Sequence, residues 1–294
     1  MTWQIALVVM MAASVTSTLI QRHYSQKSSL PATIPSAASY LFGVIPVGLT
    51  AGFFVFPHTI HWSWWLAILL ALCGTSMAVA GAIGFRVARH LTVAANMTIG
   101  KVTGLTTITL GWAVLGEGLT TWQLVGGAIL FIAALLAIWA PAKTTTGAFQ
   151  HLRLSVVLLA LVASVALAIG LVTEKAILGH MDIGGVFLVG WTTQTLAMTL
   201  LAIKDVSREH LRTFWLHECK WSTLMGAING LTGVFYVYAI FHSNNISLVT
   251  ALLAVTLPLT IFGAYVFLHE REHHRIMWIS LAISFVGLLV SAIH

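Results

Sequence analysis

Ten apolar stretches, each long enough to cross a bilayer, constrain the fold of this chain more than any other feature. They run approximately over residues 2–21, 34–56, 62–85, 92–116, 119–139, 152–173, 184–203, 221–241, 246–268 and 275–293. The stretches are continuous and lack the alternation of a membrane β-barrel, so they indicate helices. Hydrophobic residues make up 59% of the chain and charged residues 7%, too few to cover the surface of a soluble protein. The sequence therefore predicts an all-α integral membrane protein with ten transmembrane helices.

The chain divides into two halves of five expected helices each. Residues 1–140 form the first repeat, residues 152–294 the second, and the polar segment 141–151 is the linker between them. The segment VLGEGLTTWQLVGGAIL around Glu117 has a counterpart in VFLHEREHHRIMWISL around Glu270. Because each repeat holds an odd number of helices, the two copies are expected in opposite orientations across the membrane. Inverted repeats with a site between them are typical of secondary transporters.

These two segments resemble the drug/metabolite transporter superfamily, EamA-like branch, as does the pattern of apolar stretches that precedes each of them. The resemblance covers nearly the whole chain. It implies a ten-helix transporter built from two five-helix repeats. The family often places a proline about a dozen residues before the glutamate. Pro258 matches this position in the second half, whereas Leu105 stands there in the first half.

Lysine and arginine concentrate in the connections that follow the first, third, fifth, seventh and ninth stretches. These residues are Arg22, Lys27, Arg86, Arg89, Lys143, Arg153, Lys204, Arg208, Arg212, Lys220, Arg271 and Arg275. The connections on the other side hold Lys175. Since short basic loops stay on the cytoplasmic side, both termini of this cell-membrane protein are expected on the non-cytoplasmic side. Many relatives in the superfamily have both termini inside, so this expectation departs from the resemblance.

Lys101 is the charged residue expected deepest in the bilayer, because no other charge lies between Leu91 and Glu117. A lysine at that depth is energetically costly and by default marks a functional site. Three interpretations stay open. Lys101 binds an anionic group of the substrate, carries a coupling proton, or has a structural role in which it bonds to backbone carbonyls.

The substrate cavity is expected at mid-membrane, between stretches 62–85 and 92–116 of the first repeat and 221–241 and 246–268 of the second. The predicted substrate-binding residues are polar or aromatic side chains in or near the stretches: Lys101, Asn96, Trp112, Trp191, Gln194, Asn229, Tyr236 and Tyr238. Aromatic rings can stack on an organic ligand, and amides can bond either a solute or a neighbouring helix. Glu117 and Glu270 are expected to satisfy the first turn of the helix that follows each of them.

The function predicted from these features is secondary active transport of a small polar metabolite, such as an amino acid, a sugar or a related compound, by alternating access. The expected partners are this solute, the lipid bilayer and a proton as candidate coupling ion. The protein is expected to be a monomer or homodimer without a cofactor, a metal or nucleic acid. The chain has no Walker A loop for ATP.

The alternative function is an intramembrane zinc metalloprotease, because residues 269–273 read HExxH. On a helix this motif places two imidazoles, here His269 and His273, on one face with Glu270 as general base. Here it falls on a short turn between two expected membrane helices, where the symmetry with Glu117 already accounts for the glutamate. The chain is therefore expected not to be an enzyme.

Overall fold

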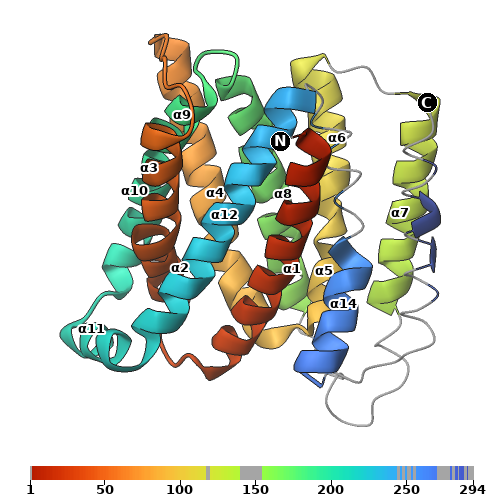
Figure 1. Ribbon diagram of the computed structural model, residues 1–294. Coiled ribbons are helices and arrows are strands. Elements are labelled where there is room, and N and C mark those ends of the chain that lie inside the picture. The colour runs from red at the N-terminus through yellow and green to blue at the C-terminus, as the bar shows by residue number, and fades with distance from the viewer. Residues whose placement is uncertain are drawn as a thin grey trace.

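The chain is helical throughout the part that the structure, a computed structural model, describes (Figure 1). That part comprises residues 2–116, 120–139, 154–243 and 256–269, with isolated positions between 246 and 290. Six of its helical stretches are long and apolar enough to cross a membrane: Trp3–Lys27, Thr33–Phe54, Trp64–His90, Ser155–Ile177, Ile183–Asp205 and Arg208–Ser243. The protein is thus an all-α membrane protein.

The stretches are built from the following elements. The first half contains α1 (Trp3–Lys27), α2 (Thr33–Ser39), η1 (Tyr40–Val44), α3 (Ile45–Phe54), α4 (Trp64–His90), α5 (Val93–Ile99), α6 (Lys101–Leu115) and α7 (Thr121–Trp139). The second half contains α8 (Leu154–Ile177), α9 (Ile183–Gly185), η3 (Val186–Gly190), α10 (Trp191–Ala202), η4 (Ile203–Asp205), α11 (Arg208–Thr213), η5 (Phe214–Glu218), α12 (Cys219–Ser243) and α14 (Thr256–Phe267). The segments η1, η3 and η5 are π-helical.

The two halves pack against each other in matching pairs. Helix α1 of the first half lies along α12 of the second, and α4 of the first half lies along α8 of the second (Figure 1). Glycines allow the closest approaches between the halves. A Cβ added at Gly226 of α12 would lie 1.9 Å from the carbonyl oxygen of Ser39, the last residue of α2. The halves therefore share one interior.

The structure changes two expectations about helix bounds. The expected helix 92–116 is broken at Gly100 into α5 and α6, so Lys101 is the first residue of α6. The polar segment from Lys204 to Lys220, expected as a connection, contains α11 and η5, which continue directly into α12. The Ser207 hydroxyl caps α11 by accepting a hydrogen bond from the backbone N–H of His210 at 3.1 Å. Charge content alone does not distinguish such a polar helix from a loop.

Polar contacts close one end of the molecule, called here the Glu218 end, where the C-terminal ends of α1 and α4 meet the start of α12. The buried Glu218 carboxylate accepts hydrogen bonds from Tyr24 Oη at 2.8 Å, from Ser28 Oγ at 2.6 Å and from the backbone N–H of Ser29 at 3.3 Å. Arg89 donates to Ser28 Oγ at 3.3 Å. Basic residues gather here: Lys27, Arg89, Lys204, Arg208 and Arg212.

The opposite end, called the Asp182 end, is closed by two loops that pair through their backbones. Residues 57–61 follow α3 and residues 178–184 lead into α9. The backbone N–H of His61 donates to His180 O at 3.0 Å, that of Asp182 to Thr59 O at 3.1 Å, and that of Gly184 to Pro57 O at 2.9 Å. Ile60 and Met181 form an isolated antiparallel bridge. Each end of the molecule therefore has its own connection between the two halves.

Candidate functional site

A carboxyl group, Glu174, lies inside the helix bundle at the Asp182 end. It belongs to α8 within one turn of Ile177, where that helix ends, and only 5% of its surface is exposed. A carboxylate is rarely buried in a membrane-spanning helix without a function, because burial removes its hydration. Glu174 is thus the first residue of the candidate site.

Helix α10 supplies the neutral donors around this carboxyl group. The indole Nε1–H of Trp191 donates to Glu174 Oε1 at 3.1 Å, and Gln194 follows one turn further along α10. Gln194 Nε2 donates to the sulfur of Cys73 on α4 at 3.4 Å. Both α10 side chains are buried. Three spanning helices, α4, α8 and α10, therefore build one polar cluster, named here the Glu174 cluster: Glu174, Trp191, Gln194 and Cys73.

The indole of Trp191 fits between two helices that carry glycine where it passes. A Cβ added at Gly48 of α3 would lie 2.5 Å from Trp191 Cε3, and one added at Gly233 of α12 would lie 2.7 Å from Cζ2. Any larger side chain at either position would displace the ring. The two glycines thus allow Trp191 to reach Glu174 across the gap between α3 and α12.

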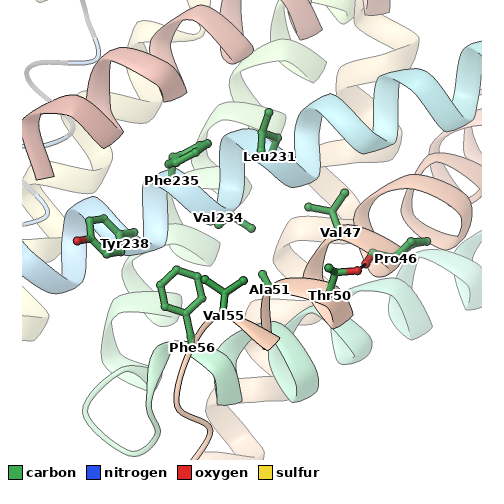
Figure 2. A pocket seen from close by; sticks show the side chains of 10 residues that line it. All are labelled: Pro46, Val47, Thr50, Ala51, Val55, Phe56, Leu231, Val234, Phe235 and Tyr238. Carbon is green, nitrogen blue, oxygen red and sulfur yellow. Dashed lines mark hydrogen bonds between the residues drawn. The ribbon is translucent and has the colours of Figure 1, made fainter. Parts of the chain in front are cut away.

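Beside Trp191, α3 and α12 border a partly open cavity of about 660 Å³ (Figure 2). Its lining comes from one side of α3 beginning at its first turn, the residues just after it and the second half of α12: Pro46, Val47, Thr50, Ala51, Val55, Phe56, Leu231, Val234, Phe235 and Tyr238. Hydroxyl groups enter this lining from Thr50 and Tyr238, and the other side chains are apolar. The volume is that of a small-molecule site.

An aromatic series connects the cavity with the Glu174 cluster. The Trp191 ring contacts Phe187 edge-on, with ring centres 4.8 Å apart, and Phe187 contacts Phe56 at 5.7 Å. Phe56 then lies 6.0 Å from Tyr238, whose ring is 4.0 Å from that of His242 near the end of α12. The candidate site therefore has two adjacent compartments, a polar one around Glu174 and an apolar one between α3 and α12.

The structure brings some of the sequence-predicted residues together and separates others. Trp191 and Gln194 share the Glu174 cluster, Tyr238 lines the cavity, and Tyr236 is buried in the surrounding core. Trp112 on α6 is 56% exposed and is not among the residues that line the cavity. Its exposure is expected for an aromatic side chain that faces lipid.

The predicted amides lie elsewhere. Asn229 of α12 accepts a hydrogen bond from the Ser17 hydroxyl of α1, so it joins two helices. Asn96 is half-buried on α5, one turn before the break at Gly100. Lys101 directly follows that break, and its side chain lies outside the described residues. On the neighbouring helix α8, Ala160 shares a packed cluster with Ile99, about 21 Å of helix rise from Glu174.

Part of the predicted site falls on residues that the structure does not describe. These include Glu117, Glu270, His273 and most of 244–255. One wall of the predicted mid-membrane cavity is expected to come from this last segment. Within the described ranges, no three His, Cys, Asp or Glu side chains come together as metal ligands. The HExxH hypothesis therefore stays a prediction.

Glu174 is the site residue that sequence reasoning missed. In the sequence it looks like half of a polar pair, Glu174-Lys175, at the end of an apolar stretch. A usable signal is present, since Glu174 directly follows the apolar stretch 152–173. Its partners in the cluster, Trp191 and Gln194, lie on another helix.

No protein-family model and no curated protein matches this chain. Its fold, however, matches solved structures, including one described only as "Crystal structure of protein". That structure superposes with a TM-score of 0.68 over 98% of this chain and 96% of its own length, at 16% sequence identity. At this identity the likeness establishes a shared fold over the whole chain and no more.

Proposed function

We propose that this protein is a secondary transporter that moves a small metabolite across the membrane by alternating access. In this proposal it has ten transmembrane helices in two inverted five-helix repeats, as in the drug/metabolite transporter superfamily. The chain has no enzymatic activity in this proposal. The observation that carries the proposal is the matched packing of the two halves.

An inverted repeat relates the first helix of one half to the first helix of the other, and the third to the third. Such a relation exchanges the α1–α12 contact with the α8–α4 contact, and both contacts are present. The second spanning stretch of each half also contains a π-helical segment, η1 in the first and η3 in the second. Both features support two copies of one unit that face each other across the interior.

The chemistry of the cavity supports a narrower class of solute than the sequence does. The lining from α3 and α12 is apolar apart from Thr50 and Tyr238, and it holds no charged side chain. Such a lining favours a solute with an apolar body over a sugar, because sugar hydroxyls buried there would lack partners. An amino acid with an apolar side chain satisfies this requirement when that side chain occupies the apolar lining and its charged ammonium and carboxylate groups stay outside it.

The proposed orientation places the Glu218 end in the cytoplasm and both termini on the non-cytoplasmic side. Basic residues at the Glu218 end support it, as the C-terminal ends of α1 and α4 carry Lys27 and Arg89. A tag on the N-terminus should then react with an impermeant reagent added to intact cells. Reaction only after the cells are permeabilised would reverse the orientation.

The test of transport begins with thermal shifts of the purified protein in detergent. Leucine, phenylalanine, glucose, succinate and uridine form the panel, and a solute that binds the folded state raises the apparent melting temperature. Solutes that bind are then measured as radiolabelled counterflow into proteoliposomes. We expect leucine or phenylalanine to stabilise the protein and to exchange across the membrane. Absence of counterflow for every solute of the panel would overturn the proposal.

Matched tryptophan substitutions locate the solute. Ala51→Trp places an indole inside the cavity, and we expect it to abolish both the thermal shift and the counterflow. Ala71→Trp makes the same change on an exposed face of α4, away from the cavity lining, and should leave both intact. Equal effects of the two substitutions would remove the cavity from the transport path.

A further inference from the structure

Glu174 is a carboxyl group whose surroundings are arranged for a group that changes its charge. Its hydrogen-bond donor, Trp191 Nε1, is neutral, and so is the amide of Gln194 one turn along α10. Neutral donors stabilise a buried carboxylate less than a cation does, because the charge keeps most of its desolvation penalty. A bound proton removes that charge, and the Oε1 atom can still accept the bond from Trp191.

The groups that face Glu174 from neighbouring elements are a thiol and phenols, so Glu174 is the member of this cluster that changes charge. Cys73 approaches from α4 and Tyr40 from η1, and α12 contributes Tyr236 to the same core. A thiol and a phenol are uncharged at neutral pH, whereas a carboxyl group changes charge as its hydration changes. Lys175 follows Glu174 on α8 and points to a different side of that helix.

Trp191 connects the charge of Glu174 to the shape of the cavity. Its ring lies against Gly48 and Gly233, and the neighbours of these glycines, Val47 and Val234, line the cavity. The Nε1 bond to Glu174 holds the indole in this position. A change in that bond therefore acts on both helices that enclose the cavity.

We propose that Glu174 binds the proton that couples transport to a proton gradient, and that Trp191 transmits its protonation to the α3–α12 cavity. This inference rests on the proposed transport function and names its coupling ion. The proton comes from water at one side of the membrane, binds a carboxylate oxygen of Glu174 and returns to water at the other side. No covalent bond to the solute forms or breaks.

Proteoliposomes that carry wild-type protein or Glu174→Gln test the proposal through the pH profile of leucine counterflow. Wild-type counterflow should change with pH, because exchange requires one protonation state of Glu174. The glutamine variant cannot release a proton, so its remaining counterflow should have a flat pH profile. A pyranine dye trapped in the vesicles should report proton movement upon leucine addition for the wild type alone.

The outcomes separate this inference from the transport function on which it rests. No wild-type counterflow with any solute of the panel overturns the transport function. Wild-type counterflow with a flat pH profile, or a Glu174→Gln variant that keeps the wild-type profile, overturns the proton assignment alone. Trp191→Phe keeps an aromatic ring but lacks the N–H, and it should shift the midpoint of the pH profile. An unshifted midpoint would exclude Trp191 from the coupling.

If Glu174→Gln fails to fold, wild-type protein decides the question with dicyclohexylcarbodiimide. The protonated carboxylic acid adds across a C=N bond of this reagent to give an O-acylisourea, whose acyl group then migrates from oxygen to nitrogen. The stable N-acylurea that remains on the side chain is assigned to a residue by mass spectrometry. The rate of modification of Glu174 should fall as the pH rises. A rate that does not depend on pH, or no modification of Glu174, overturns the proton assignment.

Discussion

The two ends of the molecule are closed by different kinds of contact. At the Glu218 end, side chains from α1, α4 and α12 gather around one carboxylate that is 7% exposed. At the Asp182 end, the two loops 57–61 and 178–184 pair through backbone groups, with an additional bond from the Thr59 hydroxyl to Asp182. The first closure is buried, whereas the second is exposed on the side of the 57–61 loop, although Met181 in the other loop is buried.

This difference indicates which end opens more readily. Exposed backbone hydrogen bonds exchange with water at little net cost, whereas a buried acceptor that loses its donors pays the full penalty of desolvation. The cavity also lies between the second half of α12 and α3 with the residues just after it, which lead into the loop at the Asp182 end. In the proposed transport cycle, we therefore expect the Asp182 end to open more readily than the Glu218 end.

The largest effect is expected from a disulfide that locks the Asp182 end. Ile60 and Met181 are paired in an antiparallel bridge, where Cα atoms lie about 5 Å apart, a distance that suits a disulfide. We expect Ile60→Cys with Met181→Cys, in a Cys219→Ser background, to lose nearly all leucine counterflow when oxidised and to regain it with dithiothreitol. Ile60→Cys alone is the control. Full counterflow through completely cross-linked protein would mean that these loops stay together during transport.

A smaller effect is expected from removing the buried carboxylate at the other end. Glu218→Ala leaves the donors of Tyr24 and Ser28 without their acceptor, which should lower the free energy of unfolding by about 1–3 kcal/mol. Thr59→Val removes one hydroxyl at the Asp182 end and should cost less than about 1 kcal/mol, since the backbone pairs remain. Apparent melting temperatures of the two variants give the comparison. Equal shifts would contradict the difference between the ends.

The smallest effect concerns the accessibility of a native thiol. Cys219 is half-buried beside Glu218, where it packs against Leu30 and Phe214. Glu218→Gln should loosen this packing and accelerate maleimide labelling of Cys219 several-fold. Asp182→Asn, the matched change at the other end, should leave the labelling rate unaltered. Faster labelling in both variants would indicate that the two closures are coupled.

Sequence patterns predict the parts of this fold that depend on composition and period. Apolar stretches such as 62–85 and 152–173 correspond to α4 and α8, because a bilayer tolerates little else at that length. The break before Lys101 has a weak signal, a glycine in an apolar helix. The π-helical segments have none that distinguishes them from α-helix, since they arise from packing against other helices.

The residues of the candidate site likewise divide into those that the sequence identifies and those that only the structure reveals. Trp191 and Gln194 could be identified because polar and aromatic side chains in an apolar stretch need partners. Glu174 could not be identified as their partner, because its burial depends on how α10 crosses α8. The role of Gly48 and Gly233 is likewise visible only in three dimensions, where the edge of an indole passes both backbones.

The π-helical segments η1 and η3 also determine how the helices that follow them are rotated about their axes. A π turn holds one more residue than an α turn, so its conversion to α-helix turns the helix beyond it by about 100° and advances it by about 1.5 Å. For η1, that screw motion would carry Thr50 and Ala51 of α3 around the helix axis and away from α12. For η3, it would swing Trp191 off the carboxyl group of Glu174. A one-residue change in register in either half would thus turn a different face of that spanning helix toward the interior.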